Sequence, residues 1–126
     1  MPLDIEQSLK SARELIENQQ DENARMLLLE LLKEDANNIA ALLMLGGSYF
    51  SSGKYAEAEM AFDRLILIEP GNGRFSIALF NVLWKMNRSE EALEEIKRFM
   101  KIADRDIEQE TINQYTAIIN TLTSQT

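Results

Sequence analysis

Small and large apolar residues recur along this chain with a period of 34 residues. Alanine stands at Ala24, Ala58 and Ala92, and each alanine is followed four and seven residues later by a large apolar side chain. These followers are Leu28 and Leu31, Phe62 and Leu65, and Ile96 and Phe99. Residues at these spacings share one face of a helix. We therefore expect one helical unit repeated three times.

The middle unit carries the clearest pattern. Its marked positions are Leu45, Gly46, Tyr49, Gly53, Tyr55, Ala58, Phe62 and Pro70. This pattern resembles the tetratricopeptide repeat, a helix-turn-helix unit of about 34 residues. The resemblance implies an all-α fold, a right-handed α-solenoid with repeats over residues 5–38, 39–72 and 73–106. An amphipathic segment over 107–123 is expected to cap it, so residues 1–126 are predicted to form a single domain.

The register predicts helices over 3–18, 22–34, 38–51, 54–68, 73–86 and 89–103. Gly53 and Asn87 are expected to leave a helix in the left-handed conformation, and Asp21 and Ser89 to cap the second helix of a pair. Phe80 departs from the family pattern, because it stands where a small residue lets two helices cross closely. It is expected either to splay its helix pair or to rotate the third repeat.

Two adjacent glycines interrupt the helix expected over 38–51, although each costs up to about 1 kcal/mol there relative to alanine. Gly46 is expected to face Ala58, where two helix backbones approach each other. Gly47 lies about 100° further round the helix. It is expected to open a hollow beside Phe50 on a surface that contacts a partner.

The composition argues against catalysis and against nucleic-acid binding. The chain has neither histidine nor cysteine, which removes the commonest general base, the usual zinc ligands and the thiol nucleophile. We therefore predict a non-enzymatic protein without cofactor or metal. The net charge of −8 repels phosphate backbones but is compatible with a basic protein partner.

The same composition predicts a cytoplasmic protein. No stretch approaches the length of an apolar membrane span, and the first residues carry neither a basic segment nor an apolar run typical of a signal peptide. The lack of cysteine suits a reducing compartment.

The resemblance implies a binding surface, because in this family the first helices of successive repeats line a concave groove that holds a peptide or a partner helix. Helical spacing selects the groove residues, which are Leu9, Arg13, Ile16, Leu43, Gly47, Phe50, Arg74, Ile77, Asn81, Trp84 and Lys85. Aromatic residues and arginine often anchor protein interfaces. For Trp84 the alternative is packing against the capping helix. The sequence thus predicts an interaction module that binds an apolar or amphipathic segment of another protein.

Two other functions are compatible with this pattern. One is a self-associating scaffold subunit, whose groove or capping helix is buried in a homodimer. The other is a small acidic chaperone or inhibitor that sequesters its partner, as do the translocator chaperones of bacterial secretion systems, which the chain resembles in size and architecture.

One branch of the family binds the acidic tails of heat-shock chaperones through a clamp of lysines, asparagines and an arginine. In this chain the clamp positions hold Leu9, Arg13, Met44, Arg74 and Ala78. Only Arg74 keeps a suitable charge at its place. We therefore expect no binding to such tails.

Overall fold

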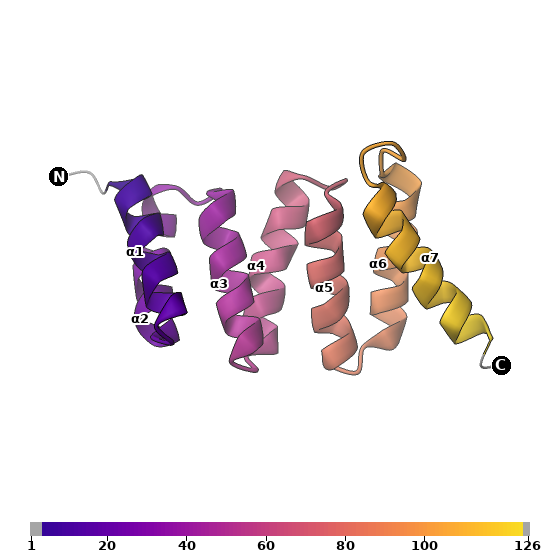
Figure 1. Ribbon diagram of the computed structural model, residues 1–126, viewed down its shortest axis with the longest axis horizontal. Helices are drawn as coiled ribbons and strands as arrows, with labels where there is room; N and C mark the ends of the chain where they lie inside the picture. Colours follow the sequence, from indigo (N-terminus) through magenta and orange to yellow (C-terminus); the bar gives the residue numbers. More distant parts are fainter. Residues whose placement is uncertain (1–3, 125–126) are drawn as a thin grey trace. The chain divides into compact units, whose positions relative to one another are not determined.

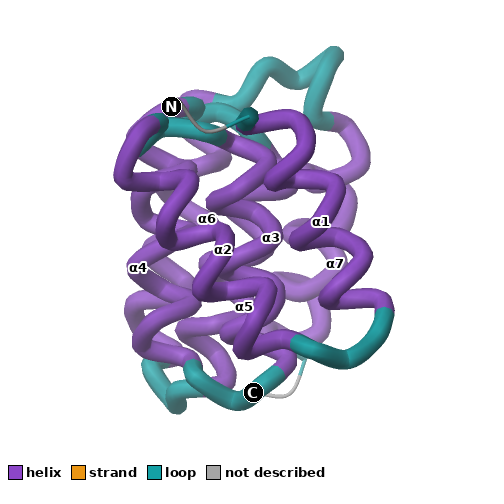
Figure 2. Tube along the Cα trace, turned by 90° about the vertical axis from the view of Figure 1, so that its left-hand side faces the viewer, coloured by secondary structure: helices purple, strands orange, loops and turns teal. Residues whose placement is uncertain are grey.

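The computed structural model describes residues 4–124, and these residues form seven α-helices without a strand (Figures 1 and 2). The helices are α1 (Ile5–Glu17), α2 (Asp21–Glu34), α3 (Ile39–Ser51), α4 (Tyr55–Ile68), α5 (Gly73–Lys85), α6 (Ser89–Ile102) and α7 (Gln109–Thr123). This architecture confirms the all-α fold class. The first six helices begin and end within two residues of the expected bounds, and α7 begins two residues later than expected.

Helices α1, α3 and α5 begin at positions that repeat every 34 residues. Asp4, Asn38 and Asn72 are the N-caps of α1, α3 and α5, and each side chain accepts a hydrogen bond from a backbone N–H of the first turn. These N–H groups have no acceptor inside the helix, so the capping side chains fix where each helix starts.

The turns inside the three helix pairs share a left-handed residue. The φ angle is 62° at Gln19, 74° at Gly53 and 60° at Asn87. The expectations for Gly53 and Asn87 are confirmed. Gln19 adopts the same conformation although its residue type does not favour it, so the turn geometry of the repeat prevails over the local preference.

The expected capping role of Asp21 and Ser89 is wrong. Each is the first residue of its helix, and the N-caps are Gln20 and Arg88, whose side chains make no capping hydrogen bond. The left-handed residues Gln19 and Asn87 directly precede the N-caps, so the cap position falls on Gln20 and Arg88 instead. The Asp21 carboxylate instead accepts a hydrogen bond from the Ser48 hydroxyl at 3.0 Å.

The chain divides into two compact units, of which the first ends at Ile68 and the second begins at Glu69. Unit 1 contains α1 to α4. Within it, α1 packs against α2, α2 against α3, and α3 against α4 (Figure 1). The central core cluster of unit 1 consists of Ala12, Leu28, Leu31, Ala41 and Leu45.

Gly46 allows α3 and α4 to pack closely. A Cβ atom at this position would overlap the Phe62 ring, whose Cδ1 atom would lie 2.9 Å away. The nearest group is thus Phe62 rather than the expected Ala58, one turn earlier on α4. Gly47 is exposed, and a Cβ atom there would meet nothing within 4 Å. The expected division between a packing glycine and a surface glycine is confirmed.

Unit 2 contains α5, α6 and α7, and α5 packs against both other helices. Ala92, Ile96 and Phe99 of the 34-residue period are buried, as the pattern predicted. Phe80 is buried too, and its ring meets the Tyr115 ring of α7 edge-on at a centroid distance of 5.7 Å. The large side chain at this position is therefore packed against the last helix of the unit.

Candidate protein-interaction surfaces

The predicted binding residues of unit 1 lie on α1 and α3, two helices that contact each other. We call them the α1/α3 strip, and they are Leu9, Arg13, Ile16, Leu43, Gly47 and Phe50. Arg13 and Gly47 are exposed, and the other four residues are half-buried. Leu9 packs partly against the core cluster, and the Phe50 ring meets Tyr55 edge-on at 5.4 Å. The strip therefore presents partly covered apolar side chains around an exposed glycine.

The predicted binding residues of unit 2 all lie on α5. They are Arg74, Ile77, Asn81, Trp84 and Lys85. Trp84 keeps 42% of its surface exposed, and its indole stacks on the Phe80 ring with the centroids 5.6 Å apart and an interplanar angle of 18°. Because Phe80 is buried, this stacking supports one face of the indole from within the unit.

A cavity of ≈ 330 Å³ lies beside Trp84, between α5 and α7. We call it the Trp84 hollow, and its lining residues are Phe80, Trp84, Ala117, Ile118, Thr121 and Leu122. The indole thus combines both expectations, since it lines a cavity with the last helix and remains partly exposed. Sequence reasoning expected this helix to cap the repeats, with packing against Trp84 or burial in a homodimer as alternatives. The spacing of Ile118 and Leu122 was the available signal that α7 also contributes to an apolar surface.

Four polar side chains hold α7 against α5 and α6. The Ser76 hydroxyl donates a hydrogen bond to the Glu95 carboxylate at 2.7 Å and lies 2.6 Å from the Tyr115 hydroxyl. The Ser76 proton is directed at Glu95, so the Tyr115 O–H donates to Ser76. Glu95 also accepts two hydrogen bonds from the Arg98 guanidinium, at 2.7 and 2.6 Å. This network fixes α7, which forms one wall of the Trp84 hollow.

Burial raises the pKa of Tyr115 well above its ordinary value and outweighs the lowering by the Ser76 hydrogen bond, and the nearby Glu95 carboxylate also raises this pKa. The side chain is fully buried and has its hydroxyl hydrogen-bonded. Burial and the Glu95 carboxylate both favour the neutral phenol, so Tyr115 serves as a hydrogen-bond donor at neutral pH.

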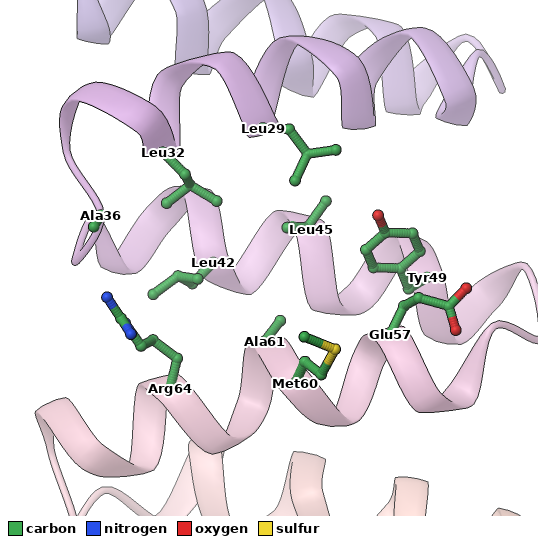
Figure 3. Close-up of a pocket in the computed structure, with 10 residues that line it drawn as sticks. All are labelled: Leu29, Leu32, Ala36, Leu42, Leu45, Tyr49, Glu57, Met60, Ala61 and Arg64. Atoms are coloured by element: carbon green, nitrogen blue, oxygen red, sulfur yellow. The ribbon is translucent and has the colours of Figure 1, made fainter.

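Unit 1 has a further apolar surface, which sequence reasoning missed. A cavity of ≈ 500 Å³ lies between α2 and α4, with α3 as its floor (Figure 3). We call it the α2/α4 hollow, and it is lined by Leu29, Leu32, Ala36, Leu42, Leu45, Tyr49, Glu57, Met60, Ala61 and Arg64. The repeat pattern explains the buried positions of α2 and α4 but gives no role to the exposed Leu29 and Met60. Those two apolar residues without a packing role were the sequence signal that could have indicated the α2/α4 hollow.

A buried arginine joins α2 to α3 in the same unit. The Arg25 Nη1 atom donates hydrogen bonds to the hydroxyls of Ser48 and Ser52, at 2.8 and 3.1 Å. Its guanidinium also lies 5.1 Å from the centre of the Tyr49 ring, a cation–π distance. These contacts give the buried guanidinium hydrogen-bond and ring partners inside unit 1, and Arg25 therefore joins α2 to α3.

Residues 49–111 of the chain match the family model described as tetratricopeptide repeat. The matched stretch is half of the chain. The chain belongs to the tetratricopeptide repeat family. A comparison with curated protein sequences found no match.

Solved structures of other proteins share this tetratricopeptide repeat fold. A point mutant of MamA aligns with a TM-score of 0.71 and 21% identity, over 82% of this chain and 75% of MamA. The type III secretion translocator chaperone SycD of Yersinia enterocolitica, in an alternative dimer, aligns with a TM-score of 0.79 and 17% identity, over 96% of this chain and 92% of SycD. SycD in complex with a peptide of the translocator YopD aligns with a TM-score of 0.79 and 17% identity, over 95% of this chain and 92% of SycD.

Within residues 4–124, no helix combines the length and apolarity that a membrane crossing requires. The same residues contain no group of three or more acidic, histidine or cysteine side chains that could hold a metal ion.

Proposed function

We propose that this chain is a non-enzymatic interaction module that binds an apolar or amphipathic segment of a partner protein. The Trp84 hollow carries the proposal, because it joins a partly exposed indole to an apolar cavity of ≈ 330 Å³. Tryptophan is among the residues that most often anchor protein interfaces, and anchors fill such pockets. Membership of the tetratricopeptide repeat family supports the same conclusion.

The exposed polar side chains of α5 define what such a segment looks like. Arg74 and Lys85 are exposed on α5 together with Asn81, so the segment bears apolar residues for the cavity and polar or acidic residues beside them. The α1/α3 strip of unit 1 provides a second contact surface, with Phe50 as its aromatic residue and Arg13 as its cation. The net charge of −8 favours the approach of a partner that is basic elsewhere.

A fluorescence titration tests the proposal. Trp84 is the only tryptophan. Adding an amphipathic helical peptide, whose leucines alternate at spacings of three and four residues, is therefore expected to change the intensity and wavelength of the Trp84 emission. Fluorescence anisotropy of the same peptide, carrying a dye, then gives its affinity for variants without this tryptophan. Trp84→Glu is expected to weaken binding at least about tenfold, since a buried interface anchor contributes about 2 kcal/mol or more.

Gln114→Glu is the matched control, because it adds the same charge at an exposed site of α7 that does not line the hollow. It is expected to leave the affinity unchanged. Circular dichroism shows whether each variant is folded. Equal affinities of the folded wild type and the folded Trp84→Glu variant would contradict the proposal.

A chaperone role is the second candidate, and the likeness to SycD favours it. SycD binds a peptide of the translocator YopD in a solved structure and aligns with nearly the whole of this chain. A chaperone of this kind keeps an aggregation-prone apolar segment soluble. Light scattering of such a segment with and without the chain distinguishes this role from simple binding, and a basic client would be released at high salt.

A further inference from the structure

Unit 1 exposes an apolar face that the proposed function does not use. Four large apolar side chains of unit 1 are strongly exposed: Met26, Leu29, Met60 and Leu67. All four lie on α2 or α4, the helices that border the α2/α4 hollow. Met60 lines the hollow and yet keeps 74% of its surface exposed, so it projects from the rim rather than filling the cavity.

The α4 side of this face has a pattern of opposite charges. Glu57, Met60, Arg64 and Leu67 follow at spacings of three, four and three, which places them on one stripe of the helix. Glu57 and Arg64 both line the hollow (Figure 3). They lie at equal distances on either side of the Met60–Ala61 pair, and the helix rises about 1.5 Å per residue.

We propose that two copies of this chain associate through the α2/α4 hollow, with α4 of one copy antiparallel to α4 of the other. A two-fold axis between Met60 and Ala61 brings Glu57 of each copy opposite Arg64 of the other copy. Symmetry creates this ion pair twice. The projecting Met60 of each copy then packs beside the small Ala61 of the other copy and enters its hollow.

The charge pattern selects a second copy as the occupant. In the antiparallel arrangement every charge of the stripe meets its opposite, whereas a parallel arrangement would place Glu57 against Glu57. Opposed like charges weaken an interface and so exclude the wrong arrangement. An unrelated partner would need to reproduce the same spacing of charges, while the chain itself supplies that spacing automatically.

Sedimentation of the full chain over a concentration series up to millimolar tests the proposal. The wild type is expected to form dimers, and Met60→Glu is expected to sediment as a monomer. Ile107→Glu is the matched control, since Ile107 is equally exposed but lies outside the hollow, and it is expected to dimerise like the wild type. Circular dichroism verifies that each variant is folded.

A charge exchange tests the antiparallel register itself. Glu57→Arg alone places like charges opposite each other twice and is expected to weaken the dimer at least about tenfold. Glu57→Arg combined with Arg64→Glu restores both ion pairs and is expected to recover the wild-type affinity. A wild type that remains monomeric, a dimer insensitive to Met60→Glu, or a double variant as weak as the single one would each overturn the proposal.

Discussion

At the scale of single residues, Gly46 and Gly47 show how neighbours of the same type can have different roles. Gly46 is buried beside the Phe62 ring, where α3 and α4 approach, and Gly47 faces open space. Helix rotation of about 100° between consecutive residues separates the two environments. The absent side chain therefore permits packing at the first position, and at the second it leaves the surface of α3 open.

Alanine substitutions measure this difference. Gly46→Ala is expected to lower the free energy of unfolding by about 1–3 kcal/mol, because overpacking against Phe62 outweighs the gain in helix propensity. Gly47→Ala is expected to raise it by up to about 1 kcal/mol, since its methyl group meets no neighbour. Urea denaturation gives both values. A destabilised Gly47→Ala variant would show that the faces of α3 are assigned wrongly.

At the scale of helices, α7 is positioned by a buried polar network rather than by apolar contacts alone. Tyr115 meets the Phe99 ring edge-on at 5.6 Å and hydrogen-bonds Ser76 of α5 through its hydroxyl. A partner for a buried hydroxyl requires one specific helix placement, whereas apolar contacts allow several. The network therefore determines which α7 residues line the Trp84 hollow.

The pH dependence of stability tests the role of Tyr115. Its pKa is raised in the folded state above the ordinary value of about 10, so unfolding releases a proton above that pH. The stability contributed by this group is complete below about pH 10 and is lost as the pH rises toward the folded-state pKa.

Tyr115→Phe is expected to reduce the loss of stability above about pH 10, and at neutral pH to cost about 1 kcal/mol from the lost hydrogen bond. Urea denaturation of both proteins at a series of pH values measures the effect. If the free energy of unfolding falls equally with pH for the wild type and the variant above about pH 10, the phenol is not buried in this network.

At the scale of the whole molecule, acidic residues strongly outnumber basic ones. The chain carries 21 acidic and 13 basic residues. Ion pairs such as Lys33–Glu30 and Lys97–Glu94 are strongly exposed, and exposed pairs contribute little to stability. Repulsion among the unbalanced carboxylates is therefore expected to oppose the compact state.

Added sodium chloride is expected to raise the melting temperature by a few degrees, because it screens this repulsion more than it weakens the exposed ion pairs. Glu14→Gln combined with Glu17→Gln is the matched variant, since both residues are exposed near the C-terminal end of α1. It is expected to melt at a higher temperature and to respond less to salt. A melting temperature that falls with salt in both proteins would contradict this explanation.

The spacing of residues along the chain was sufficient to predict the repeat, and with it the all-α fold, the helix bounds and the packing role of Gly46. These features depend on contacts within one repeat unit or between helices adjacent in sequence, so spacing along the chain is sufficient to predict them. For Trp84 the sequence left open whether the indole is exposed or packed against the last helix. The assignment of Asp21 and Ser89 failed because a cap depends on the backbone conformation of the preceding turn.

The positions of the hollow surfaces, in contrast, follow from how the helices pack in three dimensions. The wall that α7 adds beside Trp84 depends on the Ser76–Tyr115 hydrogen bond, which joins residues 39 positions apart. The α2/α4 hollow depends on side chains from three helices. In the sequence, its exposed Met60 cannot be distinguished from the other apolar residues at helical spacing. A period predicts which side of a helix is apolar, but the distance between neighbouring helices decides whether that side is filled or left open.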